Sequence, residues 1–73
     1  HRVAWYHWNT PGALADVNRL FADEGVNVTF QSLATQGEYG YMVTDTAAEV
    51  PEVILERLQE AKAHIRLRLL TRE

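Results

Sequence analysis

Segments with strand-like alternation and segments with helical spacing of apolar residues follow one another along the 73-residue chain. Their order restricts the fold more than any other feature of the sequence. Stretches that alternate, or that are rich in β-branched and aromatic residues, predict strands at residues 2–8, 26–35, 39–45 and 64–71. Apolar residues at helical spacing predict helices at residues 11–24 and in a segment that opens at Pro51. Because strand crossovers are right-handed, both helices should cover one face of a four-stranded antiparallel sheet. This is the α+β, ferredoxin-like βαββαβ fold.

Start and stop signals support both predicted helices. Thr10 is expected to cap the first helix, with Pro11 at its first position and Gly25 as a left-handed stop. Its apolar stripe consists of Leu14, Val17 and Phe21, widened by Ala13 and Leu20. The stripe of the second helix consists of Ile54, Leu58 and Ala61, with Val50, Leu55 and Lys62 nearby.

Alternation assigns the strand residues to faces. In the second predicted strand, one face should hold Val26, Val28 and Phe30, and the other Asn27, Thr29 and Gln31. In the last predicted strand, one face should hold Ile65, Leu67 and Leu69, and the other Arg66 and Arg68. Residues 36–38 predict a hairpin turn, and Gly40 indicates close packing or a bulge. The second strand is expected at a sheet edge, where unpaired backbone favours pairing with a second copy of the chain.

Composition limits the classes of function. The chain has 47% hydrophobic residues, no cysteine, a net charge of −3 and a pI of about 5.5. This is enough apolar material for one small core, and it leaves no disulfide framework or thiolate metal site. An acidic chain lacks the basic face of a nucleic-acid binder, although Tyr39 and Tyr41 superficially resemble base-stacking residues. No segment resembles a membrane span or a signal peptide, and the start at His1 without methionine suggests a piece of a larger protein.

Catalytic and metal-binding patterns are not recognisable in the sequence. The three histidines, His1, His7 and His64, have no close spacing with one another, so no metal site is expected. Ser32 lies in a predicted strand without a nucleophile-elbow sequence, and residues 11–14 contain a single glycine and no phosphate loop. We therefore expect no catalytic residue in this chain.

Polar residues bracket the first predicted helix, in the stretch HWNTPGALADVNRLFADEGVN. The backbone N–H groups of Gly12, Ala13 and Leu14 would lie at the helix N-terminus, which attracts a carboxylate. Strand alternation predicts that His7 and Asn9, which both donate and accept hydrogen bonds, lie on the same side. A small amino acid needs this mixture of donors and acceptors. An equally acceptable interpretation is that Asn9 forms a turn and Asn27 satisfies a helix end.

The same stretch, followed by GYMVTD and closed by IRLRLL, resembles the ACT domain at the C-terminus of D-3-phosphoglycerate dehydrogenases. The resemblance covers nearly the whole chain, residues 1–73. Its most specific parts are the His-x-Asn-x-Pro-Gly start and the GVNV, GYMVTD and IRLRLL segments. It implies a regulatory domain without chemistry of its own, excised from a cytoplasmic, NAD-dependent dehydrogenase of serine biosynthesis.

The resemblance also implies a ligand and an assembly. In the family, two copies pair edge to edge, and L-serine binds at their interface and inhibits the catalytic domain. The family's ligand residues carry over onto His7 and Asn9 of one subunit and Asn27 of its neighbour. Trp8 departs from the family pattern, in which an acidic or polar residue is more usual. Two alternatives therefore stay open: a purely structural dimerisation module without ligand, and a sensor for another amino acid.

Overall fold

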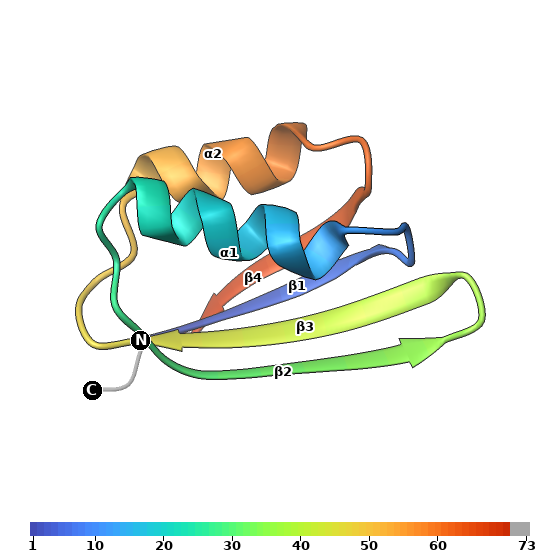
Figure 1. Ribbon diagram of the computed structural model, residues 1–73, viewed down its shortest axis with the longest axis horizontal. Helices are drawn as coiled ribbons and strands as arrows, with labels where there is room; N and C mark the ends of the chain where they lie inside the picture. Colours follow the sequence, from blue (N-terminus) through green and yellow to red (C-terminus); the bar gives the residue numbers. More distant parts are fainter. Residues whose placement is uncertain (71–73) are drawn as a thin grey trace.

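The computed structural model describes residues 1–70, and within them the six predicted elements occur in the predicted order (Figure 1). They are β1 (Arg2–Trp8), α1 (Ala13–Asp23), β2 (Val28–Gln36), β3 (Tyr39–Thr46), α2 (Glu52–Glu60) and β4 (His64–Leu70). Residue 71, which the sequence assigns to the last strand, lies outside the described residues.

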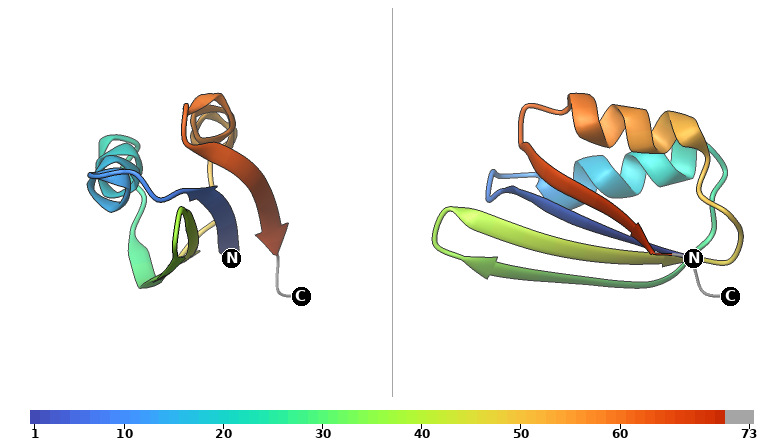
Figure 2. Two further views of the ribbon diagram at one scale, coloured as in Figure 1. Left: turned by 90° about the vertical axis from the view of Figure 1, so that its right-hand side faces the viewer. Right: turned by 180° about the vertical axis from the view of Figure 1, so that it is seen from behind.

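The four strands form one antiparallel sheet in the order β2-β3-β1-β4. Both helices lie on one face, with α1 over the β2–β3 side and α2 over the β4 side (Figure 2). We call this the covered face, and the other side of the sheet the open face. The predicted ferredoxin-like fold and the edge position of the second strand are thus confirmed.

The core lies between the helices and the covered face. Val17 and Phe21 of α1 and Ile54 and Leu58 of α2 are buried, as their spacing predicts. The strand side chains that complete the cluster are Val3, Trp5 and Met42. Burial of each large apolar side chain stabilises the fold by about 1.5–3 kcal/mol. The two amphipathic stripes therefore determine which face of the sheet is covered.

The first helix begins two residues later than predicted. Gly12, rather than Thr10, precedes its first residue, and Gly12 has a φ of 81°, which disfavours any residue with a Cβ. Thr10 makes no side-chain cap within residues 1–70, and instead its carbonyl accepts the Ala13 N–H at 3.3 Å. The Pro-Gly pair therefore forms a turn before the helix. The predicted left-handed stop at Gly25 is confirmed by its φ of 69°.

A bulge at Thr29 changes the predicted faces of β2. Val28 pairs with Thr46 and Phe30 with Asp45, so Thr29 has no partner on β3. Beyond this bulge Phe30 lies on the open face, where it is 52% exposed. Gln31 takes the covered face instead, and its Nε2 donates to Thr44 Oγ1 at 3.0 Å. Placing Phe30 on the same face as Val26 and Val28 was therefore wrong, because one extra residue reverses the alternation.

A second bulge lies at Ile65 in β4. His64 pairs with His7 and Arg66 with Tyr6, which leaves Ile65 without a partner on β1. Ile65 is exposed and lines a shallow hollow with Tyr6 and Tyr39, apart from Leu67, which packs against the core. The predicted common face for Ile65, Leu67 and Leu69 was wrong at Ile65 for the same reason as in β2.

Candidate functional site

His7 is a buried polar residue at the end of β1. Its side chain is 1% exposed, and its Nδ1 lies 2.9 Å from the Trp8 carbonyl oxygen. A carbonyl only accepts, so Nδ1 carries the proton and Nε2 presents a lone pair when the ring is neutral. Nε2 is also buried, and it has no hydrogen-bond partner within residues 1–70. Buried polar atoms are rarely left in this state, so this atom is a candidate contact for a ligand or a water molecule.

Gly40 makes room for this imidazole. It is the β3 partner of His7, and a Cβ at position 40 would lie 2.4 Å from His7 Cε1 and 2.7 Å from Nε2. On β1 the imidazole stacks on the Trp5 indole, with ring centroids 4.7 Å apart. The sequence predicted either close packing or a bulge at Gly40. The pairing of β3 with β1 is continuous at this position, so close packing is correct.

Asn9 lies just beyond β1, beside the β2–β3 hairpin. Its backbone N–H donates to the Glu38 carbonyl at 2.7 Å and its Nδ2 donates to the Gly37 carbonyl at 3.2 Å. These bonds join the end of β1 to the hairpin turn. Asn9 is exposed, so the rest of its amide faces solvent.

The first turn of α1 follows within a few residues. Of the three predicted backbone donors, Ala13 already donates to Thr10, at 3.3 Å. Gly12 and Leu14 flank it, and the left-handed Gly12 presents no side chain. The end of β1, which carries His7 and is followed by Asn9, lies at the same end of the sheet as the start of α1 (Figure 1). We call this the His7 end.

Asn27 lies at the other end of the sheet. Its carbonyl accepts the Ala47 N–H at 3.1 Å, just past the end of β3. The eight residues of β3, about 24 Å of strand, separate this Asn27 end from the His7 end. One chain therefore does not bring the three predicted side chains together.

The Asn27 side chain does not cap α1. The last carbonyls of the helix accept backbone N–H groups instead, from Gly25 to Ala22 at 3.0 Å and from Val26 to Phe21 at 2.9 Å. No side-chain hydrogen bond within residues 1–70 involves Asn27, which is exposed. The interpretation of Asn27 as a helix-end residue thus finds no support in these contacts.

An exposed ion pair occupies the Asn27 end. Arg2 donates to both Asp45 carboxylate oxygens, from Nε at 2.7 Å and from Nη2 at 2.9 Å. These hydrogen bonds lower the pKa of Asp45 below its ordinary value and raise the pKa of Arg2. The pair fixes the start of β1 to the end of β3.

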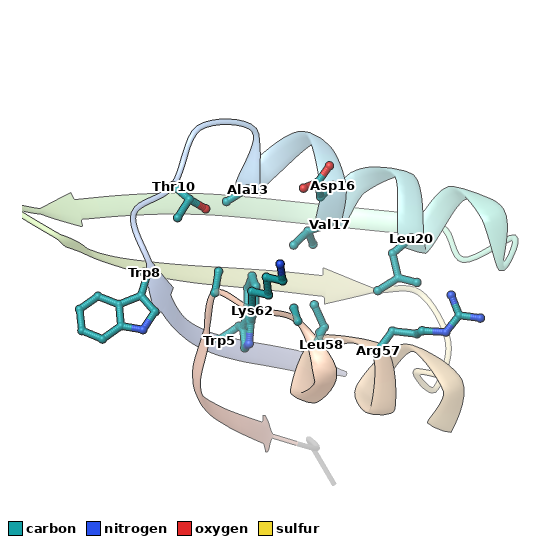
Figure 3. Close-up of a pocket in the computed structure, with 12 residues that line it drawn as sticks. Trp5, Trp8, Thr10, Ala13, Asp16, Val17, Leu20, Arg57, Leu58 and Lys62 are labelled. Carbon is teal, nitrogen blue, oxygen red and sulfur yellow. The ribbon is translucent and has the colours of Figure 1, made fainter.

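A groove between the two helices was not anticipated from the sequence. It has a volume of about 470 Å³, and both tryptophans contribute to its lining (Figure 3). The residues that line it come from segments far apart in the chain, so no local sequence motif predicts it. In residues 1–70 no three histidine, aspartate or glutamate side chains are grouped to hold a metal, and no helix is long and apolar enough to cross a membrane.

Comparison with known proteins gives a consistent result. Residues 4–65 match the family model described as the AHAS small subunit-like ACT domain. The D-3-phosphoglycerate dehydrogenase of Escherichia coli strain K12 is 39% identical over 71 residues, which cover 94% of this chain and 17% of that protein. The corresponding enzyme of Haemophilus influenzae is 33% identical over 69 residues, with coverage of 94% and 17%. The chain thus spans 17% of the length of these relatives.

Solved structures share the fold. The acetolactate synthase small subunit from Thermotoga maritima has a TM-score of 0.76 at 19% identity, covering 93% of this chain and 45% of that one. The ligand-free regulatory subunit of aspartate kinase from Thermus thermophilus has a TM-score of 0.69 at 19% identity, covering 93% and 49%. At these identities the likeness concerns the fold alone.

Proposed function

This chain belongs to the ACT-domain family, and on that premise we propose that it senses L-serine for a D-3-phosphoglycerate dehydrogenase of which it is the regulatory domain. The domain performs no chemistry itself. In the parent protein, an NAD-dependent catalytic domain would respond to serine bound between two paired regulatory domains. The shared length and identity with the bacterial enzymes support this choice among proteins that carry ACT domains.

The observation that carries the proposal is the unpartnered Nε2 of His7. It is buried between Trp5 and Gly40, at the end of the sheet where α1 begins and where the N–H groups and dipole of the helix favour a carboxylate. In the neutral ring Nε2 accepts a hydrogen bond from the ammonium or hydroxyl group of serine. In the charged ring it donates to the carboxylate. Asn9, on the exposed side, supplies a further donor and acceptor.

Antiparallel pairing of two β2 edges explains how Asn27 joins this site. β2 is an edge strand, so its outer backbone groups are available to a second chain. A twofold axis places the start of one β2 beside the end of the other. Asn27 of one copy then lies close to the hairpin of the other, to which Asn9 is bonded. Because His7 and Asn27 of one chain lie at opposite ends of its sheet, a site that contains both residues needs two chains.

Regulation in this proposal is a linkage effect. Serine favours the arrangement of paired domains in which both halves of the site are closed, and this bias reaches the catalytic domain. A coupling free energy of about 1–3 kcal/mol would be typical.

Calorimetric titration tests the ligand. L-Serine is added to the chain at a concentration at which it is demonstrably dimeric, with glycine and D-serine as controls. Saturable heat from L-serine alone is the expected result. No heat from a confirmed dimer would contradict serine sensing and leave the assembly module, while heat from a different amino acid would identify another sensor.

Mixed dimers test the shared site. The Asn9→Ala and Asn27→Ala chains should each bind serine roughly tenfold more weakly, because every site in either dimer lacks one partner. Mixing them in equal amounts should restore about a quarter of the wild-type stoichiometry, since half the dimers are mixed and each holds one intact site. Asn18→Ala, an exposed asparagine on α1, is the matched control. A mixture that stays inactive while exchanging subunits would exclude a site shared in this way.

A further inference from the structure

We infer that the groove between α1 and α2 is a second ligand site, which takes a small molecule with a flat apolar body and a single acidic group. This site lies within one chain, whereas the proposed serine site needs two chains. Its volume of about 470 Å³ falls within the usual range of small-molecule cavities, about 300–1,000 Å³.

Small residues keep the groove open. Ala13 lines it from the first turn of α1, and Ala61 and Ala63 line it from the segment that follows α2. None of the three has a side chain beyond Cβ, so they leave the space between the helix ends unfilled. Val17 and Leu58, which belong to the core, line it more deeply.

The Trp5 indole contributes to the lining in a fixed orientation. It is 4% exposed, its Nε1 donates to His64 Nδ1 at 3.0 Å, and its ring stacks on that of His7. Trp8 lines the groove beside β1 and is 42% exposed, with its ring centroid 5.1 Å from that of Tyr39. The Trp5 indole, whose orientation is set by His7 and His64, suits a flat apolar body, because aromatic groups supply large contact areas with little loss of entropy.

Charged side chains of both signs lie around the groove. Lys62 and Arg57 come from the α2 side and Asp16 from α1 (Figure 3). None of the three has an ion-pair partner within residues 1–70. The groove therefore has one excess positive charge in a chain whose net charge is −3.

This charge balance selects the ligand class. One carboxylate on the ligand brings the sum of the four charges to zero. A zwitterion would leave the positive excess, and a dianion would create a negative one. The acidic group would bind beside Lys62 and Arg57, with the apolar body against the Trp5 indole. A monocarboxylic acid with an aromatic ring has the required chemistry.

Three matched probes test this site by fluorine NMR on the full chain. They are 4-(trifluoromethyl)benzoate, the neutral 4-(trifluoromethyl)benzyl alcohol and the cationic 4-(trifluoromethyl)benzylamine. Benzoate should bind saturably and most tightly, and the amine least. Both tryptophans of the chain line the groove, so benzoate should also change the intrinsic fluorescence. Equal binding of all three probes, or no binding of benzoate, would overturn the proposal.

Variants locate the bound probe. Lys62→Gln with Arg57→Gln should raise the Kd of benzoate roughly three- to tenfold while leaving the alcohol unchanged. Arg66→Gln removes a cation from the open face and should change neither. Ala61→Leu should fill the groove and weaken both probes. An effect of Arg66→Gln equal to that of the double variant would overturn the assignment to this groove.

Excess L-serine separates the two proposals. It should not displace benzoate, because Lys62 and Arg57, which would bind the benzoate carboxylate, are not part of the serine site. Displacement of benzoate would contradict the second site without contradicting serine sensing. Failure of serine to bind would leave the benzoate result unaffected.

Discussion

The two ends of the sheet hold their polar groups in different ways. At the His7 end the imidazole is enclosed by Trp5 and Gly40, and Asn9 is tied to a hairpin. At the Asn27 end the carbonyl of Asn27 accepts the Ala47 N–H, and its exposed side chain makes no hydrogen bond within residues 1–70. One end is organised by packing before any ligand arrives, whereas the other supplies a residue held only by its main chain. Substitutions at the His7 end should therefore change the stability of the fold, whereas a substitution of Asn27 at the other end should change ligand binding alone.

The largest change in the free energy of unfolding is expected from Gly40→Ala, at the His7 end. The added Cβ would overlap the His7 imidazole, and overpacking of this kind lowers the free energy of unfolding by about 1–3 kcal/mol. Urea denaturation measures the loss. In a His7→Ala background the same substitution should cost much less, since the clash is gone. Equal losses in both backgrounds would show that the His7 end is not organised by this contact.

His7→Phe separates packing from recognition at the same end. A phenyl ring keeps the stack on Trp5 but removes the unpartnered Nε2, so the stability should stay within about 1 kcal/mol of wild type or rise. Serine binding should be lost, by at least roughly tenfold in Kd. Paired calorimetry and thermal unfolding check both parts. A Phe variant that still binds serine would remove the imidazole from the proposed site.

Asn27→Ala should have the opposite balance at the other end. Its exposed side chain makes no bond within residues 1–70, so we expect a stability change below about 0.5 kcal/mol. Serine binding should weaken roughly tenfold, as for loss of one hydrogen bond to a charged group. Asn18→Ala controls for loss of an exposed amide. A large decrease in Tm without ligand would instead indicate a structural role for Asn27.

The smallest effect should come from Arg2→Gln. The pair is exposed, so the decrease in Tm at pH 7 should be small, and no effect on serine binding is expected. Because Arg2 lowers the pKa of Asp45, its stabilising contribution is present above the ordinary Asp pKa of 3.8 and is lost as the pH falls through the lowered value. The wild-type and variant melting curves should therefore converge in acid. A difference that persists there would point to packing by the Arg2 side chain.

Periodicity was enough to predict the order of elements, the two helix stripes and the edge position of β2. It was not enough at Thr29 and Ile65, because a bulge adds one residue to a strand without changing its composition. It also placed the start of α1 too early, since Pro11 and Gly12 suit a turn as well as a helix.

The candidate site was predicted by residue type rather than by position in space. The sequence singled out His7, Asn9 and Asn27, but it gave no sign that His7 would be buried against Gly40. That contact depends on cross-strand register, which two bulges elsewhere in the sheet show to be sensitive to single residues. The groove was missed because Ala13 and Ala61 meet only in the folded chain.

The contact between Gly40 and His7 also sets the order in which this protein can diverge. While the imidazole is present, a Cβ at position 40 overlaps it, so replacing the glycine lowers the stability of the fold. Once a lineage replaces the histidine by a smaller residue, position 40 becomes free to change. Descendants with glycine alone are therefore accessible by single steps, and descendants with histidine alone are not. A side chain other than glycine at position 40 therefore indicates that the histidine at position 7 has been replaced.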